Sequence, residues 1–262
     1  MTETVPQPLP AEAPIDRLLR IMARLRDPNG GCEWDLAQDF ATIAPYTIEE
    51  AYEVADAIAG GHPAAICDEL GDLLLQVVFH SQIATDKGLF GFDDVATAIG
   101  DKMERRHPHI FGDARTSDVR LQWEQIKAAE RADDGARSAL AGVALSLPAL
   151  LRAQKLSARA ARVGFDWPDA SGPRAKIDEE LAEVDAAATD GDRAEEVGDL
   201  LFAVVNYARH LGVDAEGARR AANDTFARRF AAVEARAGPD MADLPLDTLE
   251  AHWQAVKKAE RS

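Results

Sequence analysis

DELGDLLLQVVFHSQIA at residues 68–84 and EEVGDLLFAVVNYARHL at residues 195–211 decide the fold. Each stretch is about 17 residues long, is apolar on nearly every side and contains no turn signal, which favours a buried helix over a strand. Within each apolar run, a glutamate and an aspartate stand three residues apart. We expect Asp68 to be the N-cap of the first helix, and Gly88 follows its other end.

Both stretches belong to a longer duplication. IEEAYEVADAI (48–58) matches DEELAEVDAAA (178–188), and WEQIKAAER (123–131) matches WQAVKKAER (253–261), in the same order along the chain. Such self-similarity indicates one supersecondary unit present twice, and no convincing alternating strand occurs. We therefore predict an all-α protein of two tandem helical-bundle units. The predicted segments are a disordered tail (1–14), a first unit (15–131), a linker (132–146) and a second unit (147–262).

Residues 47–59 predict the helix that precedes the first apolar one. Thr47 is the expected N-cap, Glu49 and Glu50 would lie in the first turn, and Gly60-Gly61 would end the helix. A short Gly-containing connection makes two successive helices antiparallel neighbours. The carboxylates of this helix can therefore face those of the next.

The composition excludes several classes of protein. The 262 residues include 46 acidic and 29 basic ones, so a net charge of -17 argues against a nucleic-acid binder. No apolar run approaches the roughly 18–20 residues of a membrane span, and the first 14 residues lack the features of a secretory signal. Two cysteines suit a reducing compartment. We expect a cytoplasmic protein without nucleic-acid or membrane partners.

Paired carboxylates form the chemical pattern, EExxE on one helix and ExxD on the next, in both units. Residues three apart share a helix face. The resulting sets are Glu50, Glu53, Glu69 and Asp72 in the first unit and Glu180, Glu183, Glu196 and Asp199 in the second. Four converging carboxylates repel one another unless cations neutralise them. Oxygen-only ligands favour Mg²⁺, with Mn²⁺ as a substitute, over zinc.

Two other interpretations of the acids are weaker. A solvated acidic helix face is common, but here the acids lie in the most apolar helix of each unit, where unpartnered carboxylates are costly. A di-iron bundle needs a Glu-x-x-His spacing on two helices. Glu104 and His107 have that spacing in the first unit, whereas Ala227 and Phe230 take their places in the second.

Basic and aromatic residues recur at equivalent places after the acids. Trp-x-x-x-Lys puts an indole and an ammonium on one helix face, where they could hold a base and a phosphate. A core tryptophan beside a solvated lysine is the alternative. The equivalent pairs are Arg106 and Arg229, Trp123 and Trp253, and Lys127 and Lys257.

The repeated ELGDLL/EVGDLL strings, DKMERRHPHIF (101–111), GCEWD (31–35) and VGFDW (163–167) extend this pattern over nearly the whole chain after residue 14. In these motifs the chain resembles the MazG family of nucleoside triphosphate pyrophosphohydrolases, in its tandem form. The resemblance implies an all-α homodimer. It also implies Mg²⁺-dependent hydrolysis of ribo- and deoxyribonucleoside triphosphates to monophosphate and pyrophosphate, a house-cleaning of the nucleotide pool.

The resemblance also implies roles for individual residues. The eight carboxylates above would be metal ligands, and the four of the second unit would be catalytic. Nucleotide contacts would fall on Lys176, Arg229, Trp253 and Lys257, with first-unit counterparts Lys102, Arg106, Trp123 and Lys127. Two positions depart from symmetry, since Tyr46 stands where the second unit has Lys176, and Thr225 stands where the first unit has Lys102.

The sequence leaves other functions open. One alternative is a narrower relative that acts on dUTP or phosphoribosyl-ATP. Another is a helical regulatory or scaffold protein whose acidic sites only bind metal. Neither the preferred base nor the activity of the first unit follows from the sequence, because both carboxylate sets are complete. A P-loop enzyme is excluded, since no GxxxxGK[ST] occurs.

Overall fold

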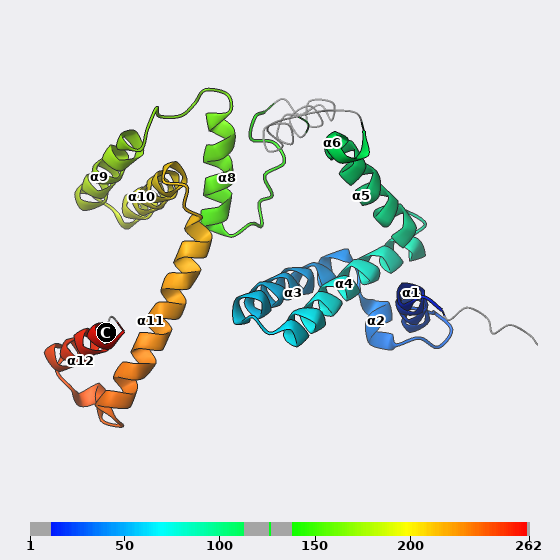
Figure 1. The fold of residues 1–262 in the computed structure, drawn as a ribbon, viewed down its shortest axis with the longest axis horizontal. Coiled ribbons are helices and arrows are strands. Elements are labelled where there is room, and N and C mark those ends of the chain that lie inside the picture. The colour runs from blue at the N-terminus through cyan, green and yellow to red at the C-terminus, as the bar shows by residue number, and fades with distance from the viewer. Residues whose placement is uncertain (1–11, 113–125, 127–137, 261–262) are drawn as a thin grey trace, which may run out of the picture. The chain divides into compact units, whose positions relative to one another are not determined.

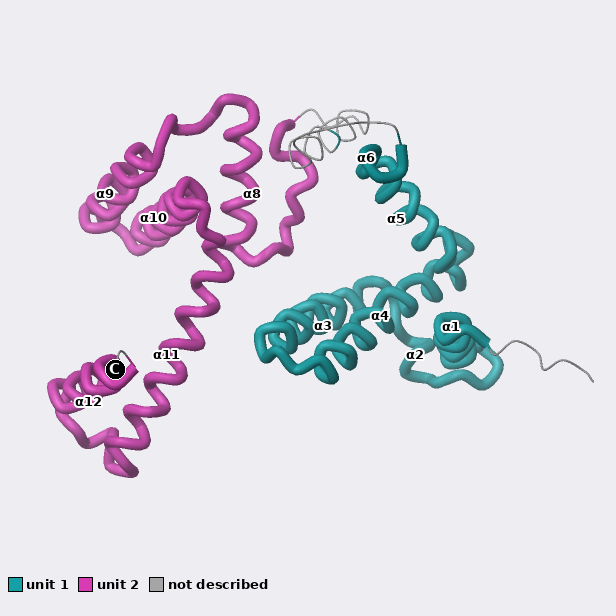
Figure 2. The backbone as a smooth tube through the Cα atoms, in the orientation of Figure 1, with its two compact units in different colours: residues 1–126 teal, residues 127–262 magenta. Residues whose placement is uncertain are grey.

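The computed structural model describes residues 12–112, 126 and 138–260. Within these ranges every regular element is helical, which confirms the predicted all-α class. The chain divides into two compact units, residues 1–126 and 127–262 (Figure 2). Most of the predicted tail (1–11) and part of the predicted linker (132–137) lie outside the described residues.

The first unit is built around one antiparallel helix pair. Its described helices are α1 (Pro14–Leu25), α2 (Glu33–Ala37), α3 (Phe40–Gly60), α4 (Pro63–Asp86), α5 (Phe92–Arg106) and α6 (Pro108–Phe111). α3 and α4 run side by side, and α1 and α5 pack on α4 (Figure 1). Gly61, whose φ of 71° lies in the left-handed region, ends α3 and turns the chain into α4.

The start of α3 differs from the prediction. Asp39, not Thr47, is the N-cap, because its side chain accepts hydrogen bonds from the backbone N–H groups of Ala41 and Thr42 at 2.8 and 2.9 Å. The predicted N-cap Thr47 lies inside the helix, where its hydroxyl is 3.0 Å from Nε2 of His80 on α4. Glu50 is therefore an interior residue of α3, pointing from the middle of a helix rather than from its first turn.

The start of α4 also differs. The helix begins at Pro63, which suits the first helical position because it needs no N–H partner there, so Asp68 is not the N-cap. Gly88, with φ 65°, follows the other end as predicted. Burial is uneven along the helix, since Val78 and Ile83 are buried whereas Leu70 is 50% exposed. The expected all-round burial is wrong for the first half of α4 in the single chain.

The core of the first unit lies where α1, α3 and α4 meet. The buried side chains Met22, Ile43, Val78, Phe79 and Ile83 form one contiguous cluster. Burying each such side chain stabilises the fold by about 1.5–3 kcal/mol. The cluster fixes the second half of α4, and the carboxylates of the same helix lie beyond it, in the half that is less buried.

The second unit repeats the antiparallel pair. Its described elements are α8 (Ala149–Ala161), α9 (Ser171–Ala186), α10 (Asp190–His210), α11 (Ala215–Ala237), a short 3₁₀ turn (Met241–Asp243) and α12 (Leu246–Ala259). α9 pairs with α10, α8 packs on α10, and α12 packs along α11 (Figure 1). The Thr189 hydroxyl caps α10 by accepting from the N–H of Asp192 at 3.1 Å. None of the described helices is long and apolar enough to cross a membrane.

Candidate active site

Three carboxylates of the second unit converge between α9 and α10. Glu180 and Glu183 come from successive turns of α9, and Glu196 comes from α10. One oxygen of each lies within 4.8 Å of the others. Glu180 is only 4% exposed, and Asp199, one turn after Glu196, lines the same cavity as Glu180. The structure thus brings together Glu180, Glu183 and Glu196 of the predicted set, whereas Asp199 lies outside this group of three and lines the cavity beside it.

The local environment opposes the negative charge of this group. Burial raises the pKa of Glu183, and the hydrogen bond to Glu180 raises it further. Burial, followed by the nearby charges of Glu180 and Asp199, raises the pKa of Glu196. Oxygen atoms that crowd together in this way could hold a metal ion, whose charge would relieve the repulsion.

Lys176 is the cation that the structure places beside these acids. Its Nζ lies 2.6 Å from Oε1 of Glu180 and 2.8 Å from Oε1 of Glu179, four and three residues further along α9. Its bonds to Glu179 and then to Glu180 raise the pKa of Lys176 above its usual value, so the amine stays charged. The predicted nucleotide contact thus lies at the carboxylate site, and it balances part of the negative charge there.

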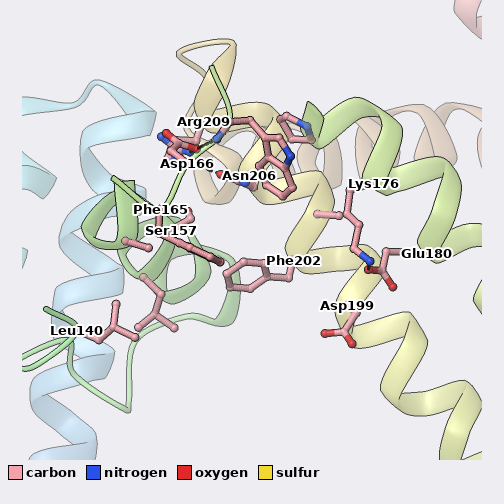
Figure 3. Close-up of a pocket in the computed structure, with 15 residues that line it drawn as sticks. Leu140, Ser157, Phe165, Asp166, Lys176, Glu180, Asp199, Phe202, Asn206 and Arg209 are labelled. Carbon is pink, nitrogen blue, oxygen red and sulfur yellow. Dashed lines mark hydrogen bonds and ion pairs between the residues drawn. The ribbon is translucent and has the colours of Figure 1, made fainter. Parts of the chain in front are cut away.

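A cavity of about 570 Å³ opens beside the carboxylates, between α8, α9 and α10. Figure 3 shows Lys176, Glu180 and Asp199 at one side of it and Asn206 and Arg209 at the other, with the ring of Phe202 between them. Apolar groups of α8 and of the segments before and after it also line the cavity; they are Leu140, Leu156, Ala160 and Phe165. A charged side next to an apolar wall suits a ligand that joins an anionic group to a flat ring system.

The loop before α9 is tied to the end of α10. Oδ1 of Asp166 accepts a hydrogen bond from Nη2 of Arg209 at 2.5 Å, and Nε2 of His210 lies 2.9 Å from the same oxygen. The Arg209 bond, together with that from His210, holds the pKa of Asp166 below its ordinary value. The next residue, Trp167, packs so tightly on Gly172 of α9 that a Cβ there would lie 2.1 Å from the indole. These contacts fix one wall of the cavity.

The first unit also has a group of three carboxylates between its paired helices, with different members of the motif. Oxygen atoms of Glu50, Glu69 and Asp72 lie within 4.8 Å of one another. Burial, then the charges of Asp72 and Glu53, raise the pKa of Glu50. Nε2 of Gln76 donates to Oε1 of Glu50 at 3.3 Å. Glu53, although predicted as a ligand, lies outside this group of three and acts on it through its charge.

Around these carboxylates, however, the two units differ. Tyr46 stands where the second unit has Lys176, so an aromatic ring replaces the cation. Trp34 packs edge-on against Tyr46 and Phe79, with ring centroids 6.4 and 6.3 Å apart. Phe79 occupies the position equivalent to Asn206 and belongs to the apolar core. Among the residues that the structure describes, the first site therefore has no counterpart of the Lys176 ammonium or of the Asn206 amide.

Arg229 and Trp253 lie away from Lys176 in the single chain. They line a second cavity, of about 650 Å³, between α11 and α12, together with Thr225 and Phe226. This cavity shares no lining residue with the first one. Nε of Arg229 is paired with Oε2 of Glu260 at 2.7 Å. The structure thus brings two predicted nucleotide contacts together, but not at the carboxylate site.

The remaining predicted contacts lie on other helices or are not described. Lys257 is in the last turn of α12, and Lys102 and Arg106 are in the second half of α5. Trp123 and Lys127 lie outside the described residues.

Sequence reasoning missed the far side of the first cavity. Asn206 and Arg209 belong to none of the predicted site motifs, and Asp166 occurs only within VGFDW. A signal was present, because Asn206 interrupts the most apolar helix of its unit just as Asp199 does two turns earlier. A buried polar residue on such a helix needs a partner, here Arg209.

Several known proteins are similar to this chain in sequence. Residues 38–111, which include all four predicted carboxylates of the first unit, match the family model described as the MazG nucleotide pyrophosphohydrolase domain. A nucleoside triphosphate pyrophosphohydrolase of Escherichia coli K12 is 52% identical over 257 residues, which cover 94% of this chain and 98% of the relative. The chain belongs to the MazG family. A second relative, the nucleoside triphosphate pyrophosphohydrolase/pyrophosphatase MazG of Thermotoga maritima, is 42% identical over 92% of this chain and 95% of its own length.

The MazG comparisons cover the two units of the chain to different extents. Both near-full-length relatives cover both units of this chain, so the tandem arrangement is shared with them. The family model itself matches only the first unit. In the described part of the chain, the second unit has a lysine and a cavity of about 570 Å³ at its carboxylates.

Proposed function

We propose that this chain hydrolyses ribo- and deoxyribonucleoside triphosphates to monophosphate and pyrophosphate at the site between α9 and α10. The observation that supports this most directly is one cavity lined by Lys176, Glu180 and Asp199 on one side and by apolar groups on the other. A triphosphate needs a centre of positive charge, and a nucleoside needs an apolar wall. The site offers both, and the names of the relatives state the same reaction.

The donor set suits Mg²⁺, with Mn²⁺ as a substitute. Glu180, Glu183 and Glu196 offer only oxygen atoms, within 4.8 Å of one another, and Asp199 is the fourth acid of the motif. Hard divalent cations prefer such ligands, whereas zinc prefers nitrogen and sulfur. Bound there, Mg²⁺ would neutralise charge on the triphosphate oxygens and lower the pKa of a water molecule.

The protein's own groups then have distinct tasks. The Lys176 ammonium supplies positive charge beside the acids and can follow the phosphate oxygens as they gain charge. A glutamate of this group that is not engaged by the metal would accept a proton from the attacking water. That water forms a bond to the α-phosphorus while the bond to the bridging oxygen breaks, and pyrophosphate leaves.

We further propose that the protein is a homodimer. On α10, Val197, Leu201 and Val204 are 40%, 51% and 43% exposed, at i, i+4 and i+7 on one helix face. The equivalent positions on α4, which are Leu70, Leu74 and Val77, are exposed as well. An apolar face repeated in both units of the tandem is suited to association with a second copy.

Arg229, Trp253 and Lys257 remain proposed nucleotide contacts. In the single chain Arg229 and Trp253 line their own cavity, and Glu260 neutralises Arg229. Their contribution to catalysis therefore requires that the Arg229–Glu260 pair open and that the α11–α12 groove meet the nucleotide.

The proposal is tested by the products. The protein is incubated with Mg²⁺ and a panel of nucleoside triphosphates in ¹⁸O-labelled water, and pyrophosphate and orthophosphate are assayed separately. We expect pyrophosphate, with the label in the monophosphate, because water attacks the α-phosphorus. Orthophosphate as the product, or label in pyrophosphate, would contradict the proposal. Tight Mg²⁺ binding without turnover of any nucleotide would favour a metal-binding scaffold instead.

A further inference from the structure

The polar side of the first cavity has no role in the reaction described above. Asn206 lies seven residues after Asp199 on α10, two helical turns or about 10 Å along one face. Asn206 is 5% exposed and lines the same cavity as Asp199 and Glu180. In Figure 3 it lies next to Arg209 and apart from Glu180 and Asp199. A nucleoside held by its phosphates at these acids would extend its base into the rest of the cavity, which Asn206 also lines.

The orientation of the Asn206 amide is fixed by its neighbour. Nε of Arg209 lies 2.9 Å from the amide oxygen, and a guanidinium can only donate, so this atom is the acceptor Oδ1. Arg209 is itself held by Asp166, through the bond of its Nη2 to Oδ1. The amide oxygen is therefore engaged, and the Nδ2 group is the end that can donate to a ligand in the cavity.

We propose that Asn206 is a specificity-determining residue that donates a hydrogen bond to a carbonyl oxygen of the base. The second unit would then prefer a keto base, such as uracil or hypoxanthine, over its amino counterpart, cytosine or adenine. The buried Nδ2 donor of Asn206 is stabilised by a carbonyl acceptor on the base, whereas an amino group at the same place would set two hydrogen-bond donors against each other. This inference rests on the proposed function, because it assumes that the cavity receives the nucleoside.

The comparison between units supports the assignment to the second one. Phe79 replaces Asn206 in the first unit, and Gln82 replaces Arg209. Phe79 is 4% exposed and packed in the core, so the fold tolerates a plain apolar side chain at this position. The amide is thus particular to the second unit, where the bond from Arg209 engages only its oxygen.

Nucleotide pairs that exchange a carbonyl for an amino group test this directly. We would measure kcat/KM for UTP against CTP and for ITP against ATP in the wild type, Asn206→Ala and Asn206→Asp. One neutral hydrogen bond is worth roughly tenfold, so we expect the wild type to favour the keto member about tenfold and Asn206→Ala to favour neither. Asn206→Asp offers an acceptor instead and should favour the amino member. Asn29→Ala, the same change in an exposed loop of the first unit, should keep the wild-type ratios.

Binding separates this inference from the proposed function. The affinities of UMP and CMP, and of IMP and AMP, are measured by calorimetry, which needs no turnover. A keto preference that Asn206→Ala removes supports the inference even if no triphosphate is hydrolysed, in which case only the proposed function fails. Two results would overturn the inference but not the proposed function, provided that pyrophosphate is released. In one, the wild type shows no preference between the keto and the amino nucleotide of a pair. In the other, Asn206→Ala keeps the keto-to-amino ratio of the wild type.

Discussion

Asp166 shows what a single residue contributes to this site. Its contacts with Arg209 and His210 join the loop before α9 to the last turn of α10. The side chains of Asp166 and Arg209 are 23% and 17% exposed, so their ion pair is only partly screened. The pair positions both Trp167, the next residue in the loop, and the guanidinium that orients Asn206.

Asp166→Asn should lower stability in a pH-dependent way. The Arg209 and His210 bonds hold the pKa of Asp166 below its ordinary value of 3.8, so the native state binds fewer protons there than the unfolded chain. The contribution is therefore complete above pH 3.8 and is lost as the pH falls below it. We expect the variant to lose about 1 kcal/mol of unfolding free energy at pH 7, measured in urea, and less at pH 3.5.

A matched control for this prediction is Asp178→Asn. Asp178 also pairs with an arginine, Arg174, but on the exposed face of α9. We expect no measurable change in unfolding free energy at either pH. An equal loss in Asp166→Asn at both pH values would contradict the role assigned to the Asp166 charge.

At the scale of the helix, the first turn of α9 contains a glycine against which a neighbouring side chain packs. Gly172 leaves room for the Trp167 indole, which lines the cavity. Gly172→Ala would put a methyl group 2.1 Å from Cδ1 of that ring, so the indole must move. We expect a KM for nucleoside triphosphates that is roughly threefold to tenfold higher, since an aromatic contact is worth about 0.5–1.5 kcal/mol, with a smaller change in kcat.

Gly191→Ala is the corresponding control on α10. A Cβ at Gly191 would meet only Oγ1 of Thr189, at an ordinary 3.7 Å. Steady-state kinetics should therefore show a wild-type KM. If Gly172→Ala behaved in the same way, the indole would not be part of the substrate wall.

The helices also show how far the sequence could predict the site. Spacing of three on two neighbouring helices placed Glu180, Glu183 and Glu196 together, because helix geometry is local. The start of α3 was misplaced because Asp39, eight residues before Thr47, makes the stronger cap. The separation of Arg229 from Lys176 depends on how α11 packs beyond the α9–α10 pair, which no local spacing encodes. The role of Asn206 could not be predicted from the sequence, because it depends on the contact with Arg209 and on the cavity that Asn206 lines.

At the scale of the whole molecule, the exposed faces of α4 and α10 predict association. Leu201→Lys puts a charge on the α10 face, where the native side chain is 51% exposed in the single chain. We expect sedimentation to show a dimer for the wild type and a monomer for this variant, because a buried unpaired ammonium is costly. Leu145→Lys, at an 82% exposed position outside the helices, should remain a dimer. A monomeric wild type would contradict the proposed dimer.

The duplication leaves one protein with two unequal sites. Glu50 and Glu180 are equivalent residues, and each belongs to a group of three carboxylates. Glu180 has Lys176 at 2.6 Å and a cavity beside it, whereas Glu50 has the Gln76 amide. We therefore propose that turnover takes place in the second unit.

The most direct test compares pyrophosphate release by the wild type, Glu180→Gln and Glu50→Gln, with Mg²⁺ and a saturating nucleoside triphosphate. Glutamine keeps the size of each side chain and removes one negative ligand. We predict that Glu180→Gln loses activity by roughly 100-fold or more, because its carboxylate is nearly buried in the proposed metal site. Glu50→Gln should stay within a few-fold of the wild type. Retained activity in Glu180→Gln, with loss in Glu50→Gln, would contradict the account and move the chemistry to the first unit.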